Sequence, residues 1–302
     1  MTTTVTINNR DLSLSNLDKD IYPAYGFTKT RILEYYSLIA RFLLPFLKDR
    51  ALTLKRYPQG VDHDFFFEKR CPEHRPDWVE TAEIPYGESK TIHYCVANNL
   101  ETLVWVENLA SIELHVPMAK VGSPNNPDSM VFDLDPGPGA DVLDCAKVAL
   151  IVKDLLSGLN LECFAKTSGK KGLHVFVPLD SPKTTFVDTK TFSKAVAGVL
   201  QKNYPNLVTA KMNKEFRPNK VFINWSQNDA SKTMVCVFSL RAMDKPSVSF
   251  PFSWKDVENL AVKKDAHAFE VLAPDAIAMA EKKAAFYSSM LDKRQRLPTK
   301  WA

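Results

Sequence analysis

The stretch MVFDLDPGPG, residues 130–139, restricts the fold more than any other part of the chain. Its apolar run predicts a buried strand, which must end where the prolines and glycines begin because they cannot continue a sheet. Side chains alternate along a strand, so Asp133 and Asp135 would share one face, opposite Phe132. The sequence therefore predicts a buried strand that presents two carboxylates side by side where it ends.

Two such carboxylates repel each other unless one is protonated or a cation lies between them. An oxygen-rich pair beside an open turn suits Mg²⁺ or Mn²⁺, and the glycines let backbone or substrate approach closely. The same pattern also fits two aspartates that cap the following helix and face solvent, because aspartate is common at such turns. The motif alone leaves both interpretations open.

The stretch KTSGKKGLHVFVPL, residues 166–179, places a basic turn with two glycines before an apolar strand. Its glycines free backbone N–H groups for an anion, and Ser168 and Lys171 add a hydroxyl and a charge. The GxxxxGK[ST] pattern of a P-loop is absent, and an ordinary basic hairpin turn would look similar. A metal motif followed by a phosphate motif nevertheless favours phosphoryl-transfer chemistry.

A third polar stretch, residues 217–243, contains a predicted strand that reaches Asn224, a polar run with Gln227, and a strand that ends at Arg241. Between residues 211 and 245 there are seven Lys or Arg and three Asp or Glu. This local excess of positive charge is typical of phosphate-binding surfaces, although a solvated face would look similar.

Periodicity predicts the remaining elements. Residues 28–49 have apolar positions at helical spacing behind Thr28, which is placed to cap them. Further helices are expected near 141–157, 189–203 and 274–290, and a long loop at 123–129. Strands are expected in the runs ALTLKRY, ETLVWVEN, SIELHVPM, MVFDLD, LHVFVPL, KVFINW and TMVCVFSL.

Strands and helices are interspersed without a regular βαβ alternation or an internal repeat. The expected fold class is therefore α+β (mixed α/β), with two closely packed lobes whose mixed or antiparallel sheets are flanked by helices. No linker is obvious, so we expect residues 1–302 to form a single domain without a separate ligase or nuclease segment.

The net charge, the cysteines and the length of the apolar runs limit the class of protein. A net charge of +4 excludes a strongly basic tail, so an anion-binding surface has to arise from local clustering. The five cysteines have no paired spacing, which predicts reduced thiols rather than a disulfide framework. No apolar run is long enough to span a membrane and no leader is visible, so a soluble, cytoplasmic protein is expected.

The three polar stretches, in this order, resemble the archaeo-eukaryotic primase superfamily, specifically the primase-polymerase domain of the ligase D type used in prokaryotic non-homologous end joining. The resemblance covers nearly the whole chain. The matching stretches are NLDKDIYPAYGFTK (16–29), TLKRYPQGVDHDFFFEK (53–69), ELHVP (113–117), FDLDPGPG, KTSGKKGLH, KVFINWSQN and FSLR.

This resemblance implies a role for each matching residue. The ligands of two catalytic Mn²⁺ or Mg²⁺ ions would include Asp133 and Asp135. The residues near the incoming triphosphate would be His115, Ser168, Lys171, Gln227 and Arg241, while the templating base or the nucleotide would stack on Phe66 and Phe67. A 5′-phosphate across a gap or break would be bound by Asn16, Lys19 and Lys29, with Lys55 and Arg56 nearby along the nucleic acid.

The chain departs from the family at Asn224, where the family has a third metal-binding aspartate. An amide keeps a carbonyl oxygen but removes a full negative charge from a site for two divalent cations, so weaker metal binding is expected. Asn224 remains a metal-site and catalytic candidate, and it makes the activity of this sequence less certain than that of the family.

The implied function is a template-dependent DNA/RNA polymerase, a nucleotidyltransferase that prefers ribonucleotides and acts at gaps and broken ends during double-strand break repair. Its partners would be gapped or broken DNA with a 5′-phosphate, NTP or dNTP, Ku, and an ATP-dependent ligase on a separate chain. No membrane partner is expected.

Three alternatives are open. Asn224 also fits a non-catalytic or inactivated protein that only binds DNA ends. A haloacid-dehalogenase-like phosphatase opens its active site with a similar hydrophobic-Asp-x-Asp motif, but no paired acidic motif follows here. A zinc module would use Cys71 and His74, but no second ligand pair has suitable spacing.

Overall fold

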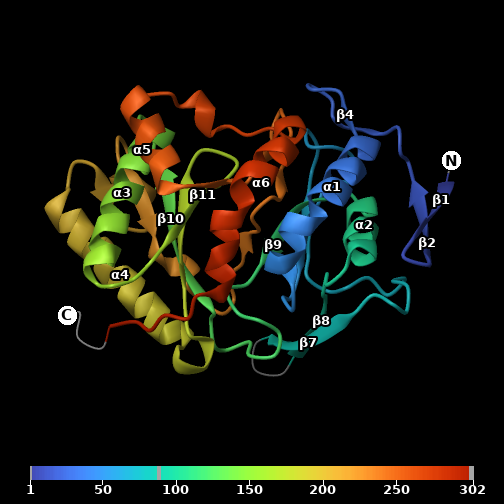
Figure 1. Cartoon of the computed structure of the whole chain (residues 1–302), viewed down its shortest axis with the longest axis horizontal. Helices are drawn as coiled ribbons and strands as arrows, with labels where there is room; N and C mark the ends of the chain where they lie inside the picture. The colour runs from blue at the N-terminus through green and yellow to red at the C-terminus, as the bar shows by residue number, and fades with distance from the viewer. Residues whose placement is uncertain (1, 87–89, 299–302) are drawn as a thin grey trace. The chain divides into compact units, whose positions relative to one another are not determined.

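The computed structural model describes residues 2–86 and 90–298, which form a mixed α/β fold with several antiparallel sheets, as predicted (Figure 1). The chain divides into two compact units. Within the described ranges, no helix has the length and apolar character that a membrane span requires. The first unit comprises Met1–Pro117, Val235–Ser249 and Leu272–Glu281, and the second comprises Met118–Met234, Phe250–Val271 and Lys282–Ala302.

The first unit contains two helices of its own and short sheets. Strands β5, β6 and β9 form the antiparallel part of a four-stranded sheet with the order β15-β9-β5-β6. Helix α6 (Ala273–Ser288) begins in this unit and ends in the second. The other elements are β1 (Thr2–Ile7), β2 (Arg10–Ser15), β3 (Asp20–Tyr22), β4 (Phe27–Thr28), α1 (Lys29–Leu47), β5 (Thr53–Arg56), β6 (Phe66–Glu68), β7 (Thr81–Tyr86), β8 (Lys90–Cys95), α2 (Leu100–Asn108), β9 (Ser111–Val116), β15 (Met234–Val235), β16 (Leu240–Arg241) and β17 (Ser247–Val248).

Helix α1 confirms the helix predicted at residues 28–49. The apolar positions that predicted it are buried, and Ile39 and Leu43 have no exposed surface. Thr28 occupies the position before the first turn, but its side chain makes no capping hydrogen bond. The backbone N–H of Lys29 instead donates to the carbonyl of Lys19 at 2.8 Å, which places the start of the helix beside the segment after β2.

The strand predicted for ETLVWVEN was wrong, because this run forms helix α2. The side chain of Asn99 accepts a hydrogen bond from the N–H of Thr102 at 2.9 Å and caps the helix. Leu103, Val104 and Val106 are all buried, so the helix is covered on several sides. A short apolar run buried in this way shows no helical periodicity in the sequence.

Another predicted strand, TMVCVFSL, is interrupted. Only its ends pair, as β15 and as part of β16. Between them Phe238 adopts a φ of +63°, outside the extended region. The other predicted strands all form, although most are shorter than the runs that predicted them.

The second unit is built on a six-stranded sheet with the order β13-β14-β10-β12-β11-β18. All its pairings are antiparallel except β13 with β14. The loop predicted at 123–129 leads into β10. The elements are β10 (Ser129–Pro136), α3 (Val142–Gly158), β11 (Phe164–Thr167), β12 (Leu173–Pro178), α4 (Phe186–Asn203), β13 (Val208–Thr209), β14 (Val221–Asn224), β18 (Pro251–Phe252) and α5 (Trp254–Lys263), with 3₁₀ turns at Ser181–Lys183, Lys214–Phe216, Trp225–Gln227, His267–Phe269 and Ser289–Asp292.

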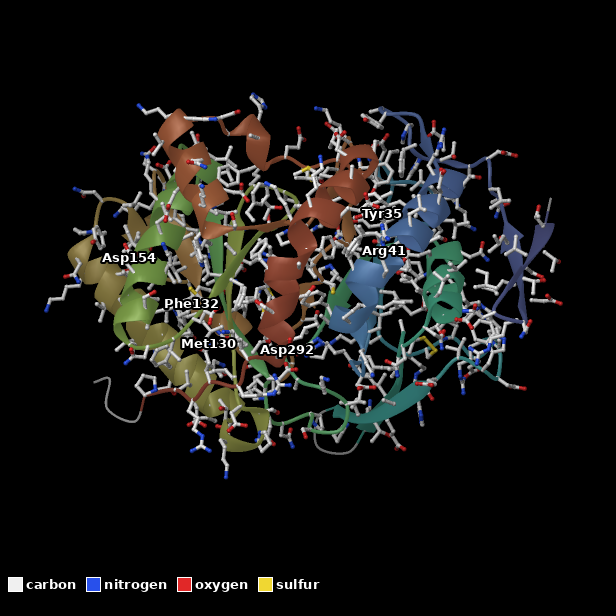
Figure 2. The ribbon with its side chains drawn as sticks, viewed as in Figure 1. Tyr35, Arg41, Met130, Phe132, Asp154 and Asp292 are labelled. Atoms are coloured by element: carbon white, nitrogen blue, oxygen red, sulfur yellow. A yellow bond between two sulfur atoms is a disulfide. The ribbon has the colours of Figure 1, made fainter. Side chains whose placement is uncertain are left out.

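The middle of this sheet forms the core of the second unit. Helices α3 and α4 pack against β10 (Figure 1). The side chains of Met130 and Phe132, labelled in Figure 2, have no exposed surface. The Cys145 thiol in α3 donates a hydrogen bond to the carbonyl of Leu134 at 3.4 Å. The strand that carries the two aspartates is therefore held firmly from one end to the other.

The two glycines after the aspartates are required by close packing. A Cβ at Gly137 would lie 1.9 Å from the carbonyl oxygen of Arg217. Gly139 has a φ of +86°, and a Cβ there would lie 2.0 Å from Asn219 Oδ1. The N–H of Gly137 also donates to the carbonyl of Lys220 at 2.9 Å. Only glycine lets this turn pack against the segment that leads into β14.

The prediction that all cysteines are reduced was wrong for two of the five. Cys71 and Cys95 form a disulfide with a Cα–Cα distance of 4.9 Å, whereas the buried Cys145, Cys163 and Cys236 form no disulfide in the described part of the chain. The two half-cystines meet because the segment after β6 runs beside β8, where the N–H of Cys71 donates to the carbonyl of residue 93 at 2.7 Å. A sequence separation of 24 residues carries no sign of this pairing.

Candidate active site

A row of polar side chains crosses the central sheet of the second unit. Asp133 in β10 lies directly opposite Asn224 in β14 and opposite His174 in β12. Residues paired in this way across antiparallel strands point to the same face, and Asp135 shares that face because it lies two positions further along. Asn224, the position at which the chain departs from the family, therefore lies across from Asp133 on a neighbouring strand.

The carboxylate of Asp133 is surrounded by hydrogen-bond donors. The residue is only 6% exposed. Its Oδ2 accepts from Asn224 Nδ2 at 3.1 Å and from Gln227 Nε2 at 3.4 Å. On the other side, His174 Nε2 lies 3.3 Å from Oδ1. These contacts compensate the burial of the charge and fix the direction in which its oxygens point.

The amide of Asn224 is oriented by its neighbours. Ser226 Oγ donates to Asn224 Oδ1 at 2.7 Å, while the NH₂ group faces Asp133. Within the described part of the chain, no group of three or more His, Cys, Asp or Glu is arranged to hold a metal ion. The carboxylates of Asp133 and Asp135 are hard-oxygen donors of the kind that fits Mg²⁺ or Mn²⁺, and Asn224 would add its amide oxygen if its side chain turned. This set has one charge fewer than three carboxylates.

Two residues that the sequence analysis did not assign, His174 and Lys166, continue the row. Lys166 is 1% exposed, and its Nζ lies 2.9 Å from His174 Nδ1. An ammonium group only donates, so Nδ1 accepts and Nε2 carries the proton that faces Asp133. The sequence did contain a signal for these two residues, since each is a charged or polar residue within a mostly apolar strand. Such side chains are rarely buried without a partner, so their positions indicate a polar contact inside the fold.

The turn between β11 and β12 packs against the end of β10. A Cβ at Gly172 would lie 2.1 Å from the carbonyl oxygen of Leu134, so only glycine fits. The N–H groups of Lys170 and Gly172 donate to Ser168 Oγ at 3.2 and 3.1 Å. These two N–H groups therefore form hydrogen bonds within the turn. The side chains of Lys170 and Lys171 are exposed to solvent.

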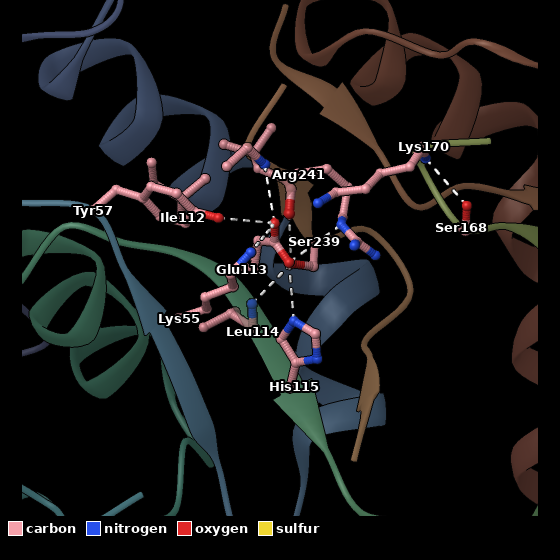
Figure 3. A network of polar contacts seen from close by, with 12 residues as sticks. Lys55, Tyr57, Ile112, Glu113, Leu114, His115, Ser168, Lys170, Ser239 and Arg241 are labelled. Atoms are coloured by element: carbon pink, nitrogen blue, oxygen red, sulfur yellow. Dashed lines mark hydrogen bonds and ion pairs between the residues drawn. The ribbon is translucent and has the colours of Figure 1, made fainter. Parts of the chain in front are cut away.

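In the first unit, three predicted residues surround a buried carboxylate that the sequence analysis missed (Figure 3). Glu113 in β9 has no exposed surface. It contacts His115, Arg241 and Lys55, which come from three different strands. Burial lowers the pKa of His115, whereas the Glu113 carboxylate opposes that shift. The signal in the sequence was an acidic residue within the apolar run SIELHV.

The aromatic residues of β6 are exposed, unlike ordinary core side chains. Phe66 and Phe67 are 44% and 55% exposed. Phe67 lies opposite Lys55, and its ring centroid is 6.0 Å from that of His115. Phe66 points to the other face, where Arg56 lies 5.1 Å from its ring. Rings exposed on a strand have the surface needed to stack on a nucleobase.

A second cluster of predicted residues in the first unit lines one cavity of about 560 Å³, namely Asn16, Lys19, Lys29 and Arg56. Lys29, the first residue of α1, is buried and donates through Nζ to the carbonyl of Ser15 at 2.6 Å. Lys19 donates to Gln59 Oε1 at 2.8 Å and to a neighbouring carbonyl. Burial and the charges of Lys19 and Arg56 lower the pKa of Lys29 to about 8. Three cationic side chains around one cavity favour an anionic ligand.

Strand alternation separates Lys55 from this cavity. Arg56 lines the cavity, whereas Lys55 turns to the opposite face of β5 and lies 3.8 Å from the ring centroid of Phe65. The structure thus brings most of the predicted residues together in three groups. One surrounds Asp133 in the second unit, and the other two surround Glu113 and the cavity in the first.

Comparison with known proteins gives one consistent family. The family model described as LigD, primase-polymerase domain, matches residues 28–280. The multifunctional non-homologous end joining protein LigD of Mycolicibacterium smegmatis is 38% identical over 292 residues, which are 92% of this chain and 38% of that protein. The bifunctional LigD protein of Bacillus subtilis is 32% identical over 248 residues, 82% of this chain and 40% of that protein. The chain therefore spans about two fifths of the length of these relatives.

A solved structure shows the same fold. The polymerase domain from Mycobacterium tuberculosis ligase D, in complex with DNA, superposes with a TM-score of 0.85 at 34% sequence identity. The match covers 94% of this chain and 99% of that domain.

Proposed function

Because the chain belongs to the LigD primase-polymerase domain family, we propose that it is a template-dependent nucleotidyltransferase that extends DNA at gaps and broken ends in non-homologous end joining. The observation that carries this proposal is the pair of carboxylates on one face of β10, inside the range that the family model matches. A preference for ribonucleotides over deoxyribonucleotides is part of the proposal.

Asp133, Asp135 and Asn224 would hold two divalent cations, Mn²⁺ or Mg²⁺. When bound, such cations activate the primer 3′-hydroxyl and neutralise the charge of the triphosphate. The protein keeps its ligands in place, because Gln227 and His174 hold the Asp133 carboxylate in one orientation. No side chain has to act as a general base.

The residues predicted to bind phosphate are proposed to bind the incoming nucleotide. On the second unit, Ser168, Lys171 and Gln227 would bind phosphate oxygens. On the first unit, the side chains of His115 and Arg241 would do the same. The exposed rings of Phe66 and Phe67 would stack on the templating base or on the nucleotide.

The cavity that contains Lys19 and Lys29 would bind the 5′-phosphate on the far side of a gap, together with Asn16, and Arg56 and Lys55 would contact the nucleic acid nearby. Gapped or broken DNA is therefore the proposed partner, as the DNA-bound structure of the M. tuberculosis domain supports. Ku and an ATP-dependent ligase activity are proposed as the further partners in end joining.

The proposal is tested by extension of a labelled primer opposite a short gap with a 5′-phosphate, in the presence of Mn²⁺ and either NTP or dNTP. We expect nucleotide addition directed by the template, with NTP preferred. Tight DNA binding without extension under excess Mn²⁺ would instead support the second candidate, a DNA-end-binding protein, which the amide at position 224 favours.

Lys19→Ala and Lys29→Ala are expected to weaken binding to 5′-phosphorylated gaps by about 10- to 100-fold, because charge-assisted bonds to a phosphate dianion are lost. Binding to the same DNA with a 5′-hydroxyl should change little. Lys48→Ala is a matched control, since Lys48 is exposed and roughly 28 Å away at the other end of α1. Equal losses on both DNAs would show that these lysines only contact the backbone.

The preference for a 5′-phosphate should also depend on pH. Lys29 has a pKa of about 8, so its ammonium form is complete well below this pH and is lost as the pH rises through it. We expect the ratio of affinities for phosphorylated and unphosphorylated gaps to fall between about pH 7 and about pH 9.5, with the bound phosphate moving the midpoint upward. In Lys29→Arg the ratio should not fall, because a guanidinium stays protonated. A ratio independent of pH in the unmodified protein contradicts this prediction.

A further inference from the structure

We propose that Glu113 is a positioning residue for nucleotide binding, which holds His115 and Arg241 in the orientation that receives the nucleotide phosphates. The inference rests on the proposed function, since it takes the phosphate-binding role of those two side chains as its premise. Glu113 itself has no exposed surface, so it acts on the nucleotide only through them.

The two carboxylate oxygens of Glu113 have separate partners (Figure 3). His115 Nε2 donates to Oε2 at 3.0 Å, and Arg241 Nε lies 3.3 Å from the same oxygen as an ion pair. At the other oxygen, Oε1, Lys55 Nζ donates at 3.4 Å and the N–H of Ala242 at 3.2 Å. One oxygen therefore orients both proposed phosphate-binding side chains. The other holds Lys55 and the backbone just after Arg241.

Only a carboxylate fits these surroundings. The ammonium, the ring N–H, the guanidinium and the backbone N–H around Glu113 all donate, and a carboxylate offers acceptors on both sides. Glutamine would present an NH₂ group to one of the two sets of donors. It would also leave the positive groups of Lys55 and Arg241 close together without the negative charge between them.

The strands bring these residues together, with Lys55 directly opposite Glu113, but they do not set the rotamers of the long side chains. Glu113 comes from β9, Lys55 from β5 and Arg241 from β16. Long cationic side chains have many rotamers. Because the buried carboxylate already holds them in one orientation, less conformational entropy is lost when the nucleotide binds. The carboxylate therefore contributes to nucleotide affinity without contacting the nucleotide.

A second buried glutamate of the same unit provides a matched control. Glu107 in α2 also has no exposed surface, but neither of its carboxylate oxygens has a hydrogen-bond partner in the described structure. Burial raises its pKa well above the ordinary value. Glu107→Gln thus makes the same chemical substitution in a buried position outside the Glu113 cluster.

The test compares nucleotide binding and extension in the full chain. Binding of an NTP is measured by calorimetry with Mn²⁺ and without DNA, and KM and kcat are measured by gap filling. In Glu113→Gln we expect the Kd and KM for NTP to rise about 10- to 100-fold, with a smaller change in kcat. In Glu107→Gln the Kd and KM for NTP should stay within about threefold of the values for the unmodified protein. The preference for a 5′-phosphate should be unchanged in Glu113→Gln and in Glu107→Gln.

A double-mutant cycle distinguishes a positioning role of Glu113 from a general loss of protein stability. If Glu113 acts through His115, its substitution should have a smaller effect on NTP affinity in a His115→Ala background than in the unmodified protein. Glu113→Asp keeps the charge in the cluster, so it should remain folded and give an intermediate Kd. Unchanged NTP affinity in folded Glu113→Gln or Glu113→Asp, or full additivity with His115→Ala, overturns the inference. Failure of the unmodified protein to bind NTP would instead overturn the proposed function.

Discussion

Asp135→Ala is expected to abolish primer extension, with a loss of about a thousandfold or more, while the protein stays folded. Asp135 lies near the end of β10 and is only partly buried, so removal of its carboxylate disturbs little of the core. It also relieves repulsion from Asp133 when no cation is bound. Loss of extension without loss of stability is the expected signature of a metal ligand.

The same change at Asp133 should abolish extension too, but with a greater cost to stability. Asp133 accepts from Asn224 and Gln227, and Asp133→Ala leaves these partly buried donors without their acceptor. The measurements are single-nucleotide extension with saturating Mn²⁺ and thermal unfolding. Asp154→Ala is the control, since Asp154 is an exposed carboxylate of the same unit, on α3 (Figure 2). A protein with both β10 aspartates replaced that still extends primers would overturn the polymerase assignment.

Asn224→Asp is expected to raise extension at limiting Mn²⁺ by about 10- to 100-fold, because it restores a third carboxylate to the proposed metal site. Affinity for the nucleotide should change much less than turnover, since the nucleotide phosphates can still bring a cation to Asp133 and Asp135. A change confined to kcat indicates an interaction made mainly in the transition state.

The structure adds a second expectation for this substitution. The NH₂ group of Asn224 donates to Asp133 at 3.1 Å, and Asn224→Asp replaces this hydrogen bond with two facing carboxylates. Without divalent cations the variant should therefore unfold at a lower temperature than the unmodified protein, and Mn²⁺ should raise its unfolding temperature by more. Asn160→Asp, an exposed position in the same unit, should show neither effect. If Asn224→Asp changes neither extension nor the Mn²⁺ response, Asn224 is not a metal-site residue.

Local patterns predicted the elements that depend on nearby residues. The periodicity of residues 28–49 predicted α1, and the apolar run before Asp133 predicted both β10 and the shared face of its two aspartates. The resemblance to the family then supplied candidate roles for residues far apart in the chain. Prediction failed at ETLVWVEN, where a helix buried on several sides has no visible period.

Contacts between distant segments were not visible in the sequence. The Cys71–Cys95 disulfide joins residues whose spacing carries no signal, and it depends on how β8 lies beside the segment after β6. The burial of His174 beside Asp133 likewise depends on the register of β12 against β10. Each of these contacts depends on which segments lie side by side, which one sequence does not specify.

The sequence by itself determined the mixed α/β class, the family, and the two aspartates on one face, because alternation and periodicity are properties of consecutive residues. The tertiary structure alone decided that Glu113 gathers Lys55, His115 and Arg241, and that Lys19, Lys29 and Arg56 share one cavity. These groups come from separate strands, loops and a helix. Their charges interact only at the few-ångström distances that folding creates, and there burial decides which of them must be paired.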